Sequence, residues 1–320
     1  MMEYPLSPIR AAARCWANVE AYMSGTFQAL TTWWSSEGIR SSGWKRALPM
    51  LALIGANLIW STSFAVGKQV MNELSPEVIT FWRCALGAVF FIPGCRGQVG
   101  KVSSRDWSIL VAMGVFGMGI PTLLQLAGLS FTLSANAAVL SSFETVSGVI
   151  LASVLLREGW SDRKVMSLIL AAVGAVLLSG GHEGGWSMSG PHLMGNAILI
   201  LAYVLFSTYT LLAKPLAGRV PVQVMTLFPF LFAALALAPF LKGPFFPSTL
   251  TGWVGLLFLS VVCTAVAYAL WNWGLASVEA SHASMTLYLQ PLVGGLIGAF
   301  VLKESLAAGF VASAALIILA

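Results

Sequence analysis

Apolar residues fall into ten long segments along the chain, separated by short polar stretches that contain Gly, Pro, Ser and charged residues. A helix of about 20 residues crosses a hydrocarbon core of ~30 Å, and most of the segments reach that length. Their periodicity is helical, whereas membrane barrel strands would alternate apolar and polar residues over about ten positions. The pattern predicts an all-α integral membrane protein with ten transmembrane helices. The segments lie near 48–69, 76–95, 107–129, 134–156, 163–181, 194–214, 222–241, 251–276, 281–302 and 307–320.

The composition indicates the same class, because 58% of the 320 residues are hydrophobic, 9% are charged and the mean hydropathy is +0.85. Soluble globular domains carry about 25% charged residues. The loops between segments are mostly short and leave no room for a separate catalytic domain. The chain has two aspartates, Asp106 and Asp162, both at segment ends, and it has no His-Glu-x-x-His motif. We therefore do not expect an enzyme.

Lys and Arg favour one side of the predicted bundle, as expected if short cytoplasmic loops retain positive charge. This bias also accounts for the net charge of +5 without a nucleic acid partner. It predicts an inner (plasma) membrane protein with both termini in the cytoplasm. The cytoplasmic side would hold Arg10, Arg14, Arg40, Lys45, Arg46, Arg96, Lys101, Arg105, Arg157, Arg163, Lys164, Lys214 and Arg219, and the other side Lys68, Lys242 and Lys303.

The cysteines give no sign of a redox or metal centre. Cys15, Cys84, Cys95 and Cys263 show no Cys-x-x-Cys spacing, and the last three lie in or at the edge of apolar segments. We expect no disulfide, no metal site and no cofactor.

Residues 1–46 differ from the rest, since they contain neither a membrane-spanning stretch nor the apolar core of a signal peptide. Two interpretations stay open for this cytoplasmic extension. One is an amphipathic helix at the membrane interface, and the other is a disordered extension or an upstream start codon. The helix would place on one face Trp16, Val19, Met23, Phe27, Leu30 and Trp34.

An internal repeat appears when the sequence is shifted by 146 residues, which aligns the two halves without a gap. Lys68 then aligns with Lys214 and Trp107 with Trp253, matches that chance rarely produces in an apolar sequence. Each half would contain five helices. Because five is odd, the second half would enter the membrane upside down, as in alternating-access transporters. Channels with inverted repeats also exist, so the repeat alone leaves both classes open.

Four stretches within the repeat resemble the EamA-type repeats of the drug/metabolite transporter superfamily. The resemblance covers about residues 48–320 and implies a ten-helix secondary transporter with a central cavity between the repeats. Members often export amino acids or other small metabolites. The stretches are NLIWSTSFAVGK (57–68), SPEVITFWRCALGAVFFIP (75–93), ANAAVLSSFETVSGVILASVLLRE (135–158) and LYLQPLVGGLIGAFVLKE (287–304).

The repeat and the resemblance divide the chain into the extension 1–46, a first repeat at 47–181 and a second repeat at 194–320. Ala320 aligns with Gly174, so the last segment lacks counterparts of residues 175–181. We therefore expect the tenth helix to be truncated at its C-terminus. Gly148 and Gly294 also align, and small residues there predict close packing between the fourth and ninth segments.

Ionisable residues inside the spans are the first candidates for a binding site, because burying a charge in a membrane costs roughly 3 kcal/mol. Glu144 lies near the midplane of the fourth segment, and Gln290 occupies the equivalent place in the ninth. Arg83 lies inside the second segment. One interpretation is a structural ion pair between Arg83 and Glu144. The other is that both face the cavity, where Arg83 would bind a substrate carboxylate and Glu144 an amine or a proton.

Aromatic residues would complete the cavity, and Trp60 and Tyr288 are the preferred candidates because they lie deepest in their segments. In the small multidrug-resistance branch of the superfamily, an acid in the first helix carries the coupling proton. This chain has Trp60 at that position. Glu144 is then the remaining candidate for proton coupling, and uncoupled facilitation stays open.

The function predicted from these observations is secondary transport of a small metabolite, such as an amino acid, across the inner membrane by alternating access, with export as the expected direction. The candidate substrate-binding residues are Arg83, Glu144, Gln290, Trp60 and Tyr288. The expected partners are the lipid bilayer, a small-molecule substrate and, as a candidate coupling ion, the proton. The alternative of a different class is a membrane protein that moves no solute by alternating access, such as a channel, a sensor or an assembly factor.

Overall fold

The computed structural model describes residues 44–95, 97–132, 134–179, 190–301 and 315–316, and every regular element within these ranges is a helix. The all-α class predicted from the sequence is thus confirmed for the described part of the chain. The predictions for the extension before residue 44 and for the truncated tenth helix lie outside the described residues.

The described residues of the first half form seven α-helices and a π-helical segment, η4, which connects α4 to α5 without a loop. A break at Ser141 separates α6 from α7. The elements are α2 (Trp44–Val70), α3 (Pro76–Phe91), α4 (Ser104–Ala112), η4 (Met113–Gly119), α5 (Ile120–Leu129), α6 (Ser134–Leu140), α7 (Ser142–Leu155) and α8 (Asp162–Ser179).

The second half repeats this order at the offset found in the sequence, because α9, α10, α11 and α13 begin 146 residues after α2, α3, α4 and α6. A second π-helical segment, η6, follows α11 just as η4 follows α4. The elements are α9 (Gly190–Leu216), α10 (Val222–Leu237), α11 (Leu250–Leu257), η6 (Phe258–Val266), α12 (Ala267–Leu275), α13 (Ala280–Met285), the 3-10 turn η7 (Thr286–Tyr288) and α14 (Leu289–Val301).

Local sequence explains where several of these helices begin. Pro76 occupies the first turn of α3, where proline lacks only an amide hydrogen that would have no helical partner. The Ser103 hydroxyl accepts a hydrogen bond from the Asp106 amide at the start of α4, and Thr249 does the same for Gly252 at the start of α11. Ser and Thr stabilise helix N-termini in this way.

Among the described residues, six helices are long and apolar enough to cross a membrane. Other predicted segments form shorter helices, such as α3 with 16 residues, and the ninth segment is interrupted by η7. The described helices therefore support a multi-pass membrane protein, while ten spans remain a prediction. The six are Ala47–Val70, Ser104–Leu129, Ala137–Leu155, Leu193–Leu216, Val222–Phe240 and Leu250–Leu275.

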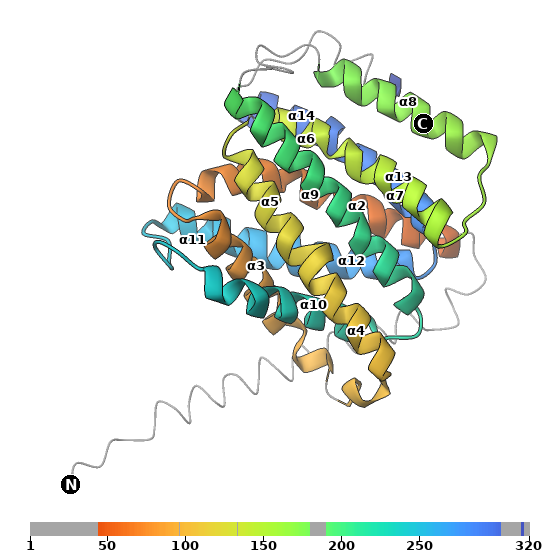
Figure 1. The fold of residues 1–320 in the computed structure, drawn as a ribbon, viewed down its shortest axis with the longest axis horizontal. Coiled ribbons are helices and arrows are strands. Elements are labelled where there is room, and N and C mark those ends of the chain that lie inside the picture. The colour runs from red at the N-terminus through yellow and green to blue at the C-terminus, as the bar shows by residue number, and fades with distance from the viewer. Residues whose placement is uncertain (1–43, 96, 133, 180–189, 302–314, 317–320) are drawn as a thin grey trace.

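Helices of the two halves are interleaved rather than packed as separate bundles. In Figure 1, α3 packs on α10, α5 and α7 pack on α9, and α2 packs on α12 and α14. At one edge of the bundle, α8 packs against α6 and α7. A site formed where these helices meet would therefore contain residues of both halves.

Glycines allow the closest of these approaches. A Cβ added at Gly148 would lie 2.5 Å from the Ser284 hydroxyl, and one added at Gly294 would lie 2.8 Å from the Ala138 side chain. These contacts confirm the close packing predicted between the fourth and ninth segments. A Cβ at Gly114 in η4 would lie 2.5 Å from the carbonyl oxygen of Pro229 in α10.

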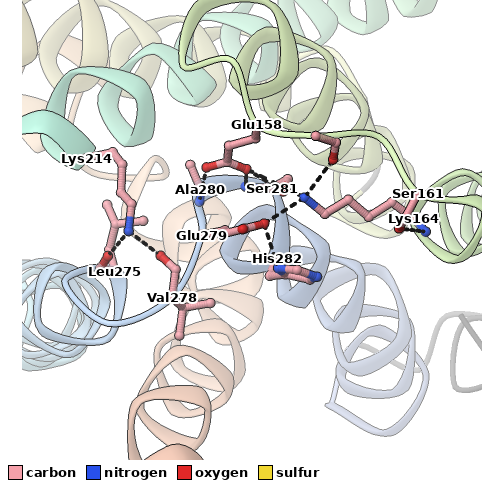
Figure 2. Close-up of polar contacts among 11 residues, drawn as sticks. Glu158, Ser161, Lys164, Lys214, Leu275, Val278, Glu279, Ala280, Ser281 and His282 are labelled. Carbon is pink, nitrogen blue, oxygen red and sulfur yellow. Dashed lines mark hydrogen bonds and ion pairs between the residues drawn. The ribbon is translucent and has the colours of Figure 1, made fainter.

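The two aligned lysines have the same structural role at helix C-termini, where carbonyl groups lack helical partners. Lys68 Nζ donates to the Thr132 carbonyl just after α5 (2.8 Å). Lys214 Nζ donates to the carbonyls of Leu275 (2.9 Å) and Val278 (2.5 Å) at the end of α12, as Figure 2 shows. Thr132 and Val278 are themselves 146 residues apart, so the repeat includes this contact.

Polar contacts also join the two halves at the helix ends near Lys214 (Figure 2). The Glu158 carboxylate accepts hydrogen bonds from the amides of Ala280 (2.7 Å) and Ser281 (3.0 Å) and so caps α13. Lys164 Nζ pairs with Glu279 at 2.7 Å. The hydrogen bond from Lys164 lowers the pKa of the Glu279 carboxyl below its ordinary value.

A second contact between the halves involves Glu73, in the loop between α2 and α3. Its carboxylate accepts hydrogen bonds from the Ser248 and Thr249 amides at 2.7 and 3.0 Å, and from both hydroxyls. The hydrogen bonds from Thr249 are the main cause that lowers the pKa of Glu73 to about 2. The contribution of this contact to the stability of the fold is therefore complete above the ordinary pKa of 4.5, and it is lost as the pH falls through about 2.

Candidate functional site

A cavity inside the helical bundle combines acidic, basic, amide and aromatic side chains. About 40 Å³ of it is open to the centres of water molecules. One water needs roughly 10–15 Å³ by this measure, so a few waters fit and a metabolite does not. The lining residues come from α2, α3, α5, α7, α9, α12 and α14. They are Trp60, Ser63, Arg83, Gln125, Glu144, Phe206, Tyr268 and Gln290.

Two pairs of these lining residues are related by the repeat. Trp60 and Phe206 are 146 residues apart, as are Glu144 and Gln290. Equivalent positions of both halves thus face one cavity. Inverted-repeat transporters bind their substrates at such a junction.

The structure brings four of the five predicted site residues together, since Trp60, Arg83, Glu144 and Gln290 all line this cavity. Tyr288 is not among the lining residues. It is 4% exposed and packs against Leu168. Substrate contact by any of the five stays a prediction.

Arg83 projects from α3 and is 5% exposed. Its Nε donates to the Thr264 hydroxyl at 3.1 Å, and that hydroxyl donates to the Leu259 carbonyl at 2.8 Å. Thr264 and Leu259 are five residues apart in η6, so the π-helical segment provides this contact. The terminal guanidinium nitrogens form no hydrogen bond with the residues that the structure describes.

Glu144 lies in the first turn of α7, where the positive end of the helix dipole favours a carboxylate. It forms no ion pair with Arg83 within 4.0 Å. Within the described ranges, no side chain or amide donates a hydrogen bond to its carboxylate. The geometry therefore favours a cavity-facing acid over the structural ion pair.

Gln290 has a side-chain hydrogen-bond partner, whereas the Glu144 carboxylate has none among the described residues. It is 4% exposed, and its Nε2 donates to Asn57 Oδ1 at 3.0 Å. Asn57 belongs to α2 and is fully buried. The two halves thus share a polar residue at this position, and one of the two is fixed by a neighbour.

The aromatic wall of the cavity is centred on Trp60. Its Nε1 donates to the Cys263 carbonyl in η6 at 2.8 Å, which fixes the indole. Its ring lies 5.0 Å from Tyr268 and 5.3 Å from Trp271, measured between centroids. These distances suit favourable aromatic pairs. With Phe206, the rings give the cavity apolar faces that can also attract a cation.

Sequence reasoning missed Gln125, Tyr268, Ser63 and Asn57 as residues in or behind the cavity wall. Gln125 and Asn57 were detectable, because each is an amide within an apolar segment. Tyr268 and Ser63 carry no such signal, since Tyr and Ser are common in membrane helices. Phe206 could have been found as the repeat equivalent of Trp60.

Comparison with known proteins agrees with this architecture. The family model described as "EamA-like transporter family" matches the chain twice, at residues 47–180 and 193–320. The chain belongs to the EamA-like transporter family. This membership confirms the resemblance seen in the sequence and makes the protein one of a family of membrane transporters.

Relatives of this EamA-family chain carry names of the same kind. An "Uncharacterized transporter" of Archaeoglobus fulgidus is 26% identical over 77% of this chain and 86% of its own length. The "Uncharacterized transporter YetK" of Bacillus subtilis is 24% identical over 79% of each chain. A solved structure titled "Crystal structure of protein" superimposes with a TM-score of 0.70 at 21% identity, over 84% of this chain and 93% of that one. The last likeness extends to the fold alone.

Proposed function

We propose that this EamA-family chain is a secondary transporter that exports a small metabolite, such as an amino acid, across the inner membrane by alternating access. Ten helices would form two inverted repeats, at 47–181 and 194–320, with both termini in the cytoplasm. Arg83 would bind an acidic group of the substrate, and Glu144 would bind an amine or a proton.

The observation that carries the proposal is the cavity between the halves, which is lined by two repeat-related pairs and by charges of both signs. Arg83 and Glu144 both line it and neither neutralises the other at contact distance. Keeping such groups in an apolar bundle is costly, so they are expected where a polar ligand binds. Because the cavity admits only a few waters, a metabolite must enter through an opening between the halves.

The contacts at the helix ends support alternate opening. Glu158 and Lys164 of the first half hold the start of α13 in the second half. Glu73 of the first half holds the start of α11. If the halves are inverted, these two contacts close opposite sides of the membrane, and breaking one at a time would expose the cavity to one side.

The inverted topology predicts the side of each loop. Reporter fusions after Lys101, Lys164 and Arg219 should give cytoplasmic signals, and fusions after Gly184 and Pro244 should give external signals. The physical reason is that an odd number of helices per half reverses the second half. A cytoplasmic signal after Gly184 would contradict the inverted arrangement.

The transport activity can be measured as flux in proteoliposomes that contain the purified protein, with and without a pH gradient. We expect flux of amino acids or similar metabolites above that of empty liposomes, and a dependence on the gradient if Glu144 carries a proton. Amino acids, sugars and cationic drugs form the first panel. Absence of flux for every compound would favour a sensor or assembly factor, and flux at channel rates without saturation would favour a channel.

A further inference from the structure

A chain of hydrogen bonds behind the cavity wall determines which way the Gln290 amide points. Thr286 Oγ1 donates to the Ala283 carbonyl at 2.7 Å. Asn57 Nδ2 donates to Thr286 Oγ1 and to the Leu53 carbonyl, each at 2.8 Å. Gln290 Nε2 donates to Asn57 Oδ1 at 3.0 Å. These hydrogen bonds connect α2 of the first half to η7 and α14 of the second half.

The order of donors and acceptors in this chain follows from chemistry, because a carbonyl oxygen can only accept. The Leu53 carbonyl must face the Nδ2 of Asn57, and the Thr286 hydroxyl has already given its proton to Ala283. The amide nitrogen of Asn57 therefore lies on that side, and its Oδ1 lies toward Gln290. Gln290 must present Nε2 to Asn57, which leaves its Oε1 as an acceptor.

We infer that Asn57 is a positioning residue that holds the Gln290 carbonyl oxygen as a fixed acceptor in the cavity, where it recognises an N–H donor of the substrate, specifically an ammonium group. Glu144, at the repeat-equivalent position, is a second acceptor in the same cavity. Trp60 and Tyr268 supply aromatic faces that suit a cation. The inference rests on the proposed transport function and specifies the substrate class.

The other half explains why only Gln290 needs this support. Tyr203 occupies the repeat position of Asn57, and its hydroxyl donates to the Ala137 carbonyl at 2.8 Å. Glu144 has no such fixing partner among the described residues. A carboxylate accepts through both oxygens, so it presents an acceptor in either orientation. An amide presents an acceptor only if its orientation is fixed, and Asn57 fixes it.

The test compares transport of L-amino acids with that of the matching 2-oxo acids, in which a carbonyl oxygen replaces the ammonium group. We expect the wild-type protein to prefer the amino acids. Asn57→Leu frees the Gln290 amide to turn its donor toward the cavity, and the preference should fall about 10- to 100-fold, the effect of losing a hydrogen bond to a charged group. Asn57→Leu with Gln290→Glu should restore it to within about threefold of wild type, because a carboxylate needs no fixed orientation.

Two further variants separate positioning from folding. Ser61→Ala removes a buried hydrogen bond from the Ser61 hydroxyl to the backbone carbonyl of Asn57 (2.7 Å), and leaves the Asn57 side chain intact. It should therefore leave the preference for amino acids unchanged. If Asn57→Leu alone does not fold, Asn57→Leu with Gln290→Leu replaces both partners by apolar groups and is compared with the Gln290→Glu double variant. The inference then requires the preference to be lost in the first double variant and kept in the second.

The outcomes distinguish the inference from the function on which it rests. If wild-type protein carries 2-oxo acids as well as amino acids, or carries only sugars, the inference is overturned and transport stands. An unchanged preference in folded Asn57→Leu overturns it as well. If no compound moves, the proposed function itself is wrong.

Discussion

Glu144→Gln should give a protein that folds with normal yield but has lost substrate transport or its dependence on pH. The side chain keeps its shape, and Gln290 shows that an amide is accommodated at the equivalent position. No described residue pairs with the Glu144 carboxylate, so neutralising it strands no partner. Loss of a charge that contacts the substrate should lower transport by about 30-fold or more. Purified yield, thermal midpoint in detergent and proteoliposome flux are measured on the same preparation.

A matched control is Glu77→Gln, the same substitution in the first turn of α3, outside the cavity lining. It should change neither yield nor flux. Two results would contradict the cavity-facing role of Glu144. The first is normal flux with a normal pH dependence in Glu144→Gln. The second is poor folding of Glu144→Gln that Arg83→Leu restores, which would reinstate the structural ion pair.

Gly114→Ala should lower the free energy of unfolding of the protein, because the added methyl group would clash with the backbone of α10. The added Cβ would lie 2.5 Å from the Pro229 carbonyl oxygen and 3.1 Å from its Cα, and backbone atoms cannot turn away as a side chain can. Overpacking of this kind costs about 1–3 kcal/mol, which corresponds to a thermal midpoint lower by roughly 3–10 °C. Thermal unfolding in detergent measures the shift.

Gly55→Ala is the control for the loss of a helical glycine. Its Cβ would lie 3.8 Å from Leu270, an ordinary contact, and Ala favours a helix over Gly by about 1 kcal/mol. The midpoint of this variant should stay the same or rise. Equal midpoints for Gly114→Ala and Gly55→Ala would mean that α10 can move away from η4 without cost.

Hydropathy and the repeat predicted much of the fold because both signals are summed over many residues and do not depend on any single side-chain contact. Membrane helices need long apolar segments whatever they pack against, and the offset of 146 residues recurs in the helix bounds. The breaks at Ser141 and at η7 escaped prediction, since no Pro or Gly stands at either place to mark them. Such local departures are decided by packing between segments far apart in the sequence.

For the site, a polar residue within an apolar segment was a better predictor of cavity lining than the depth of a residue along its helix. Arg83, Glu144 and Gln290 line the cavity, as expected because a polar group inside a membrane protein must face other polar groups or water. Tyr288 was chosen by depth alone, and depth along a helix does not specify the face on which a residue lies. The 3-10 turn η7 rotates successive side chains by more than an α-helix does, and Tyr288 points instead toward Leu168.

The capping lysines have a consequence for the history of the chain. Lysine near a helix end normally biases which way a protein inserts, yet Lys68 and Lys214 are both held by the carbonyls that they cap and would lie on opposite sides of an inverted pair. A half-length precursor with this lysine could insert in either direction and associate with its own reversed copy. Duplication and fusion of its gene would then join both orientations in one polypeptide, leaving residues without a counterpart in the other half, such as Arg163 and Lys164, to fix the direction of the first half.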